Sequence, residues 1–500
     1  MATRNSVMSV HPALGGLDLG SDPTVLDPNF LTIADNIEYL EGGQRKKRMG
    51  VLQYAPTSSY TGTYTNVMVS SGANVRALAD MWTYGATLTG TQRLLSVTSA
   101  SIFQSTGNGV WTAVTSASSF GTNTNLNTNI MFGYGTTTSG GLGDMAVFSD
   151  GVTSPVAYNP TTTTLFYPSS ASTSWPTFES AKYHLNRMFY CGISTAPSKL
   201  GYTGADNVCD STGTDAGSLN IAIGDRDRII GLSETFYGSL YVFKGPNFGS
   251  VYQLGGRTPS AFTLDKVAQG APALSHAGIV STPTDIYWIS GYGIHSLQTT
   301  VKYGNVEQAF LSLPIQKLWR EETIKRSDFA NAHGFWDPLH NTVGWSVMPN
   351  DGTRRNWLLV YNYALSDPRP GGKKYWSIWK FTNIGVTAPA LVVGTTGGSP
   401  ASHVGHPHLW FGSDEGLVYA ANMDDLNDDA EAYTARVKTP IITRLKTEQG
   451  MVPETQEKSF LGVVTYYSNV GAGDCDLRVI VDNRVQSETF SMSPGGDVLG

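Results

Sequence analysis

"MAVFSDGVTSPVAYN" spans Met145 to Asn159 and carries the pattern from which we predict the fold. An apolar strand runs into a turn at Asp150–Gly151, and a second strand containing a tyrosine follows. Glycine readily adopts the positive φ that a tight hairpin needs, so this stretch is typical of two adjacent antiparallel strands. The arrangement recurs in three later stretches, the last with its turn at Glu415–Gly416: LYVFKGPNFGSVYQL (240–254), IYWISGYGIHSL (286–297) and LWFGSDEGLVYAA (409–421).

Each copy of this pattern is predicted to form the two middle strands of a four-stranded antiparallel sheet. About seven such units follow one another between residues 75 and 440, at the spacing of roughly 50 residues that is typical of propeller blades. We therefore predict an all-β protein with a β-propeller of about seven blades. The repeats are degenerate, so six or eight blades are alternatives, and a sandwich of similar strands is another architecture that fits the pattern.

The composition agrees with short strands joined by turns. Glycine accounts for 55 of 500 residues, aromatic residues for 11% and charged residues for only 15%. A helical protein needs more charged and helix-favouring side chains on its faces. The net charge of −7 argues against a broad DNA-gripping face, which would need a basic footprint. An acidic surface also simply keeps a large protein soluble, which is the interpretation that we favour.

Three segments are predicted from changes in composition. Residues 1–70 form an extended N-terminal arm, with a short helix around Phe30–Asn36 and a basic hairpin that turns at Gly42–Gly43. Residues 71–440 form the propeller, interrupted near 306–325 by a short helix close to Ile315–Glu322. Residues 441–500 form a small C-terminal β element.

No membrane span or secretory signal is expected, because no stretch of 18 apolar residues occurs and the N-terminus has no apolar core. The three cysteines (Cys191, Cys209 and Cys475) show no CxxC spacing, so we expect synthesis in a reducing compartment, the cytoplasm.

Motifs for chemistry are scarce. The sequence holds no GxSxG, Walker, HExxH or strand-linked GxGxxG motif, so we expect no enzyme and no cofactor. Two groups have side chains that can bind metals: the histidines His403, His406 and His408, and the acidic residues Asp424, Asp425, Asp428, Asp429 and Glu431. For the histidines we favour hydrogen-bonded or solvent-facing side chains, and for the acidic residues a solvated loop. We therefore predict no metal site. The aromatic stretch KKYWSIWKF (373–381) fits either blade packing, which we favour, or stacking on sugars or bases.

Residues 15–50, "GGLDLGSDPTVLDPNFLTIADNIEYLEGGQRKKRMG", resemble the N-terminal signature of the hub or nozzle proteins of short-tailed phages, also called packaged-DNA stabilisation proteins. The stretches at 228–256 and 416–440 resemble later parts of the sequences of that family. The chain departs from the family pattern at Met49, a position that is often proline in the family. The matching signature positions are Gly15, Gly16, Leu17, Asp18, Asp22, Pro23, Ala34, Asp35, Asn36, Gly43, Arg45, Arg48 and Gly50.

The resemblance implies a virion structural protein of the phage tail. Six copies would form a ring that extends the DNA channel below the portal and adaptor, retains the packaged genome and lets it pass during ejection. Its partners would be other copies of the chain, the adaptor protein, and tail fibres or tailspikes, and the DNA would pass without sequence-specific binding. The alternative is a propeller-fold tail protein that binds or degrades glycans.

The run Arg45, Lys46, Lys47 and Arg48 is interpreted as one arm of the hairpin. Alternate side chains of a strand point to opposite faces. We hypothesise that Arg45 and Arg48 bind carboxylates within the protein or on a neighbouring subunit, while Lys46 and Lys47 are more exposed. Replacing both arginines with alanine would then weaken folding or ring assembly more than DNA affinity.

Overall fold

The computed structural model describes residues 15–54, 73–167, 175–298, 310–394 and 405–440, apart from short gaps at 25, 28, 42–43, 85–89, 99–100, 107–109, 115–127, 138–139, 368, 370–371, 423–426 and 430. Beyond residue 440 it describes six strands. The chain divides into two compact units, of which one holds residues 10–441 and the other residues 1–9 and 442–500.

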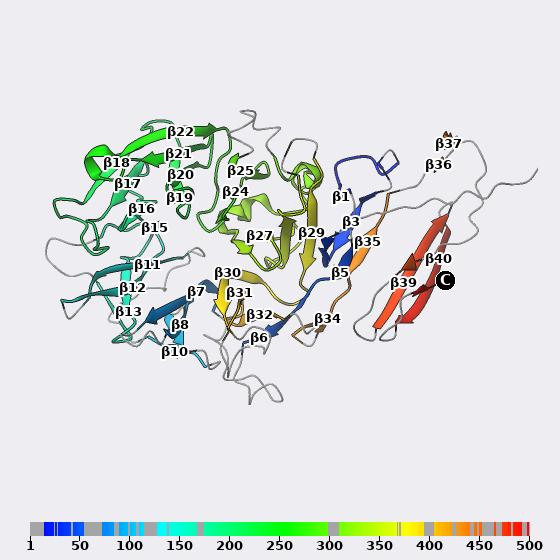
Figure 1. Cartoon of the computed structure of the whole chain (residues 1–500), viewed down its shortest axis with the longest axis horizontal. Helices are drawn as coiled ribbons and strands as arrows, with labels where there is room; N and C mark the ends of the chain where they lie inside the picture. Colours follow the sequence, from blue (N-terminus) through cyan, green and yellow to red (C-terminus); the bar gives the residue numbers. More distant parts are fainter. Residues whose placement is uncertain are drawn as a thin grey trace, which may run out of the picture. The chain divides into compact units, whose positions relative to one another are not determined.

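The larger unit is a seven-bladed β-propeller (Figure 1). The first strands of the blades contact one another in the series β30–β7–β11–β15–β19 and β23–β26–β30, which places them around a common axis. The predicted fold class is therefore confirmed.

Blades 1 to 4 are four-stranded antiparallel sheets. Blade 1 holds β7 (Val75–Tyr84), β8 (Gly90–Thr98), β9 (Ile102–Ser105) and β10 (Thr112–Ala113), and blade 2 holds β11 (Asn129–Thr136), β12 (Leu142–Ser149), β13 (Val156–Asn159) and β14 (Thr164–Phe166). Blade 3 holds β15 (Ser180–His184), β16 (Arg187–Cys191), β17 (Lys199–Tyr202) and β18 (Gly217–Asn220), and blade 4 holds β19 (Arg228–Leu232), β20 (Leu240–Gly245), β21 (Ser250–Gly255) and β22 (Thr263–Gln269), with η3 (Pro259–Ala261) before its last strand.

Blade 5 has three strands in its described part, and Phe310 forms an isolated bridge with His295 beside the third. The short helix expected near 315–322 is found here as α2, which is shorter than predicted. The strands are β23 (Ile279–Ser281), β24 (Ile286–Ile289) and β25 (Ile294–Ser296), and the insertion holds η4 (Leu313–Ile315), α2 (Lys317–Arg320) and η5 (Arg326–Asn331).

Blades 6 and 7 each hold six strands, because both ends of the larger unit add to them. Blade 6 holds β26 (Gly334–Asp337), β27 (Thr342–Val347), β28 (Trp357–Asn362) and β29 (Tyr375–Lys380), extended by β3 (Ile33–Asp35) and β35 (Arg436–Lys438). Blade 7 holds β30 (Val386–Val393), β31 (Pro407–Ser413) and β32 (Val418–Asn422), extended by β6 (Gly50–Gln53), β33 (Asn427–Asp428) and β34 (Glu431–Ala432).

The N-terminal strand β6 closes the propeller. It pairs antiparallel with β32 as the fourth strand of blade 7, and parallel with β33. β6 therefore belongs to the propeller sheet of blade 7, although it lies within residues 1–70. The remaining N-terminal strands are β1 (Gly16–Leu17), β2 (Phe30–Leu31), β4 (Ile37–Tyr39) and β5 (Arg45–Lys47).

The helix predicted around residues 30–36 is wrong. Asp35 pairs parallel with Ile378 of β29, and Ile33 pairs antiparallel with Lys438 of β35. Asn36 then has a φ of +54°, which turns the chain from β3 into β4. Local pattern alone cannot indicate this outcome, because the strand forms only between partners that lie several hundred residues away.

Buried aromatic and aliphatic side chains fill the spaces between neighbouring blades. Trp376 and Trp379 of the aromatic stretch in β29 are 0% and 4% exposed and belong to the packing on the two faces of blade 6. The hairpin turns also follow the predicted chemistry, since Gly151 and Gly416 have φ of +76° and +86°. Among the described residues no helix is long and apolar enough to cross a bilayer.

The smaller unit holds a hairpin of two nine-residue strands, β39 (Gly473–Val481) and β40 (Arg484–Met492). Its other strands are β36 (Leu445–Thr447), β37 (Gly450–Val452), β38 (Thr465–Tyr466) and β41 (Val498–Leu499).

Candidate assembly site

The basic run lies on β5 and the residues after it, opposite β4 in an antiparallel hairpin. Lys46 Nζ lies 2.9 Å from Glu38 Oε2, a carboxylate on the paired strand. Lys47 Nζ lies 4.0 Å from the centre of the Tyr433 ring, a cation–π distance. Arg45 is half-buried opposite Tyr39, and burial lowers the pKa of its guanidinium.

Arg48 is fully buried, and all five of its N–H donors are used. Two of them make a bidentate pair with the carboxylate of Asp428, with Nη1 2.8 Å from Oδ1 and Nη2 bonded to Oδ2. Nε donates to Asn36 Oδ1 at 3.1 Å. The remaining two donate to the carbonyl oxygens of Met49 at 2.8 Å and Lys380 at 3.3 Å.

Aromatic rings enclose this guanidinium. Its carbon lies 3.9 Å from the centre of the Tyr433 ring and 4.3 Å from that of Phe381. The Tyr433 hydroxyl donates to the Arg48 carbonyl oxygen. Stacked rings and a bidentate carboxylate are the partners that favour arginine over lysine in a buried position.

Asn36 connects Arg48 to two further segments. Its Oδ1 also accepts from the Lys380 backbone N–H at 2.6 Å, and its Nδ2 donates to the Thr434 carbonyl oxygen at 2.9 Å. We call this group the Arg48 clasp; it consists of Asn36, Arg48, Lys380, Phe381, Asp428 and Tyr433. It joins the N-terminal segment, the end of β29 in blade 6 and the chain that follows β32.

Of the two predicted arginine contacts, the structure shows that of Arg48, which binds a carboxylate within the chain. Lys46 also pairs with a carboxylate, and residues 46 and 48 share one face of a strand. A carboxylate of a neighbouring subunit as the partner of Arg45 stays a prediction. The predicted solvated acidic loop is wrong for Asp428, which is 6% exposed and binds Arg48.

Several signature residues occupy positions that only their own type fits. Gly16 has a φ of +80°, and a Cβ there would lie 2.2 Å from the Lys374 carbonyl oxygen. A Cβ on Gly50 would lie 2.1 Å from the Asn427 carbonyl oxygen. Both glycines thus allow close approach of a distant backbone segment.

The other signature residues shape the entry to this region. Asp18 Oδ1 accepts from the backbone N–H of Gly20 at 2.8 Å, and Asp22 Oδ1 from that of Thr24 at 2.8 Å. Leu17 is buried at 1% exposure, and Gly15 donates to the Asn29 carbonyl oxygen at 2.9 Å. Pro23 is exposed, and Gly43 lies outside the described residues.

The two groups with metal-ligating side chains are only partly described, since His403, Asp424 and Asp425 lie outside the described residues. His406 is exposed, whereas His408 is buried in β31. Asp429 has a φ of +50°, and Glu431 accepts a hydrogen bond of 2.7 Å from Asn383 Nδ2. Within the described ranges, no group of three or more His, Cys, Asp or Glu side chains is arranged to hold a metal ion.

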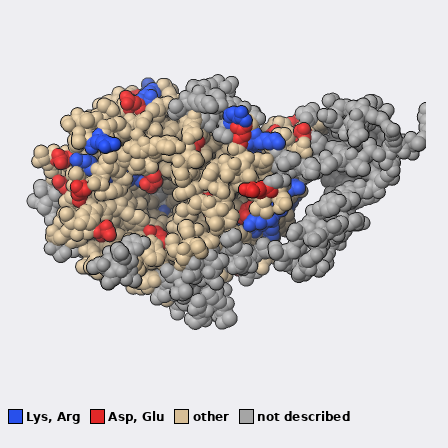
Figure 2. Space-filling view, in the orientation of Figure 1, with Lys and Arg blue, Asp and Glu red and all other residues tan. Residues whose placement is uncertain are grey.

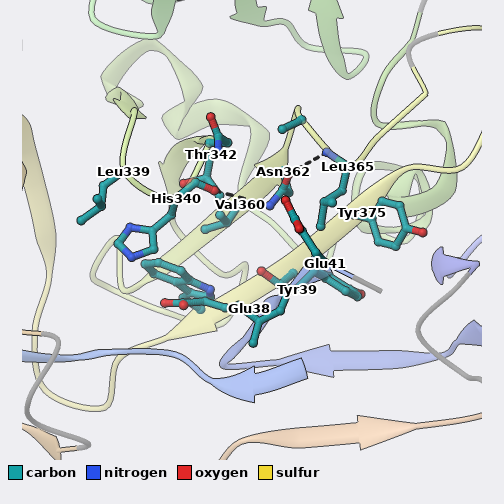
Figure 3. A pocket seen from close by; sticks show the side chains of 15 residues that line it. Glu38, Tyr39, Glu41, Leu339, His340, Thr342, Val360, Asn362, Leu365 and Tyr375 are labelled. Atoms are coloured by element: carbon teal, nitrogen blue, oxygen red, sulfur yellow. Dashed lines mark hydrogen bonds between the residues drawn. The ribbon is translucent and has the colours of Figure 1, made fainter. Parts of the chain in front are cut away.

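Next to the clasp lies a hollow of about 190 Å³, which we call the blade-6 hollow (Figure 3). Its floor is one face of the blade-6 sheet, its roof is residues 38–41 of the basic hairpin, and its wall is the turn 339–341. The floor residues are Thr342, Val360, Asn362, Tyr375, Ser377 and Trp379.

Figure 2 shows charged side chains only in scattered groups on the described surface seen there.

A second hollow, of about 470 Å³, is lined by residues of blades 2, 3 and 4 and of the segments that precede blades 5 and 6. An ion pair of 2.7 Å between Glu179 and Arg228 lies in its lining. Gly151 and Gly192 both have φ of +76° and pack against Glu179, where an added Cβ would lie 3.2 Å and 2.5 Å from the Glu179 Cβ.

The chain was compared with known proteins and solved structures. No protein-family model matches the chain, and no curated protein matches it. A quinonprotein alcohol dehydrogenase-like protein from Bacteroides thetaiotaomicron is 12% identical (TM-score 0.33), with 60% of this chain and 65% of that chain covered. YCF48 bound to a D1 peptide is 10% identical (TM-score 0.40; 75% and 98% covered), and the WD40 β-propeller domain of Doa1 is 8% identical (TM-score 0.39; 75% and 97% covered).

Proposed function

We propose that this chain is a tail hub or nozzle subunit of a short-tailed phage. Six copies form a ring that extends the DNA channel below the portal and adaptor, and the ring retains the packaged genome and lets it pass during ejection. The chain acts as a structural protein of the virion tail and not as an enzyme. Its partners are other copies of itself, the adaptor, and tail fibres or tailspikes.

One observation carries this proposal: the segment that resembles the family signature is also the segment that closes the propeller. Arg48 and Asn36 hold it to blade 6 and to residues 428–434, and Gly50 begins the closing strand β6. The signature segment thus helps to hold the fold together, which is what we expect in a structural protein.

The charge of the chain supports the passage of DNA through such a ring. The net charge is −7, and the one compact cationic run places Arg48 in the interior and Lys46 against Glu38. Negative surfaces repel phosphate and neutral surfaces do not attract it, so a genome can move past them without being held.

Native mass spectrometry of the purified full-length chain tests the proposal. We expect an assembly of six copies of the 53.7 kDa chain, and six-fold rings in electron micrographs of the same sample. Binding of duplex DNA should stay weak as the salt concentration is lowered from 150 to 50 mM, since few cations are available to displace counterions. A stable monomer or trimer, or turnover of host glycans, would contradict the proposal.

A further inference from the structure

The blade-6 hollow contains a buried hydrogen-bonding group without a partner. Thr342 is 6% exposed, and its Oγ1 has no hydrogen-bond partner among the described residues. A buried hydroxyl in this state raises the free energy of the folded protein. A ligand that supplies a donor at the floor of the hollow would relieve this cost.

His340 offers a second acceptor at the wall. Its Nδ1 lies 2.7 Å from Asp337 Oδ2, and Asp337 is only 2% exposed. A carboxylate beside Nδ1 holds the proton on that nitrogen in the neutral ring, which leaves Nε2 as an acceptor. Asp337 also accepts the backbone N–H of Leu339 at 3.0 Å, so the turn that carries His340 is fixed.

The roof adds negative charge. Glu38 and Glu41 both line the hollow, and Figure 3 shows Glu41 reaching into it from the hairpin. Lys46 pairs with Glu38 and offsets one charge. With Asp337 behind His340, three carboxylates and one ammonium surround the space, and the excess is negative.

Aromatic rings complete the lining. Tyr39 and Tyr375 meet edge to face with ring centres 5.2 Å apart, and Trp379 lies in the floor. Carboxylates, free acceptors and aromatic rings together suit a cation that carries several N–H donors.

We propose that the blade-6 hollow is a binding site for an organic cation of the guanidinium class. A guanidinium has five N–H donors and no acceptor, which complements Thr342 Oγ1, His340 Nε2 and the Glu41 carboxylate. The volume of about 190 Å³ is sufficient for one guanidinium group. The group comes either from a free small molecule or from an arginine of a second copy of this chain.

Calorimetric titration of the full-length chain with N-acetyl-arginine methylamide tests the site. The matched neutral ligand is N-acetyl-citrulline methylamide, which has nearly the same shape without the charge. We expect saturable binding of the arginine probe that is at least tenfold tighter than that of the citrulline probe. No saturation by 20 mM arginine probe, or equal affinity for the two probes, would overturn the proposal.

Two variants locate the binding. Glu41→Gln and Thr342→Val should each weaken the arginine probe about fivefold, which corresponds to the loss of one hydrogen bond or exposed charge contact of about 1 kcal/mol. Thr342→Val removes an unpartnered hydroxyl, so its thermal midpoint should not fall. Asp351→Asn is the control, since it removes an exposed carboxylate from another turn of the same blade and should bind as wild type. Wild-type affinity in both hollow variants would refute the site.

The dependence on pH gives an independent readout. Burial alone would lower the pKa of His340, but Asp337 and Glu38 outweigh it and raise the pKa, while Lys46 opposes them. Protonation of Nε2 replaces an acceptor by a donor, so the arginine probe should bind more weakly at pH 5.5 than at pH 8.5. His340→Gln should remove most of this difference, and an unchanged pH dependence in that variant would speak against a role for His340.

Sedimentation then separates the two sources of the cation. If an arginine of a second copy occupies the hollow, saturating probe will lower the mass of the assembly, and Glu41→Gln will do the same without probe. If the mass does not change while the probe binds, the ligand is a free small cation. The titration reads the site in either case, so it does not depend on the proposed ring.

Discussion

Arg48 shows how a residue that looks like a surface cation can be a core residue. It is enclosed by the rings of Tyr433 and Phe381, and its two terminal nitrogens bind the Asp428 carboxylate. A buried pair of this kind gains little over an apolar pair, but loss of one partner leaves a charge without compensation. Replacing one member of the Arg48–Asp428 pair should therefore destabilise the protein strongly.

Arg48→Ala should destabilise the protein by about 3–5 kcal/mol, because Asp428 stays buried without its partner. The measurement is the free energy of unfolding in urea, followed by tryptophan fluorescence. Lys317→Ala is the control, since Lys317 is half exposed and faces Glu321 at 3.5 Å on a helix surface, where a pair contributes about 0.3–0.5 kcal/mol. Equal effects of the two variants would show that Arg48 is not a core residue.

His295 makes stability depend on pH. It is fully buried, stacked on Trp288 and bonded to Ser290 Oγ at 2.9 Å, and burial lowers its pKa to about 3. Between pH 6.5 and 3 the unfolded chain binds a proton here that the folded chain does not, so stability falls as the pH falls. The loss amounts to about 2 kcal/mol between pH 6.5 and pH 5.

His295→Gln should remove this loss. The readout is the difference in unfolding free energy between pH 6.5 and pH 5 for wild type and variant. Asp285, whose pKa burial raises to about 6, acts with the opposite sign, because its stabilising protonated form is lost as the pH rises. It is present in both proteins and cancels, so an unchanged difference in the variant would contradict the assignment.

At the scale of elements, the closing strand β6 depends on a close approach of backbones. Gly50 pairs with Asn422 in the ladder with β32, and its missing Cβ leaves space for the Asn427 carbonyl oxygen.

Gly50→Ala should therefore cost about 1–3 kcal/mol of stability through forced displacement of the backbone. Thermal unfolding measured by circular dichroism would detect this as a lower midpoint. Gly141→Ala serves as the control, because its added Cβ meets nothing within 4 Å and its effect should stay within about 0.5 kcal/mol. A silent Gly50→Ala would mean that β6 is not held as described.

Local sequence predicted the elements whose partners lie nearby. The Asp150–Gly151 and Glu415–Gly416 turns follow from glycine chemistry, and the strands beside them pair within a few residues. β3 and the Asp428 pair were missed because their partners lie far along the chain. The available signal was the run of four adjacent cations at residues 45–48 in a chain that has few charged residues.

At the scale of the whole molecule, the ends of the larger unit are held in the same two blades. β3 and β35 extend blade 6, while β6, β33 and β34 extend blade 7. Opening of either end therefore opens the ring of blades, and we expect the closure to be part of the global folding unit and not a frayed end.

Native-state hydrogen exchange tests this expectation. The amides of β6 should exchange only by global unfolding, with the same protection free energy as those of β31 in the middle of blade 7. In Arg48→Ala, the β6 amides should lose protection together with those of β31. Selective loss at β6 would show that the N-terminal segment detaches by itself.

The pairing of β6 with β32 also determines when the propeller can close during synthesis. Gln53 of β6 and Asn422 of β32 are separated by about 370 residues, so at 5–20 residues per second the early strand waits roughly 20–70 s for its partner to leave the ribosome. During that time the nascent chain contains the earlier blades, but blade 7 is incomplete and the ring of blades is open. We expect the ring to close only after β32 has emerged, so that β6 reaches its final place long after it has been synthesised.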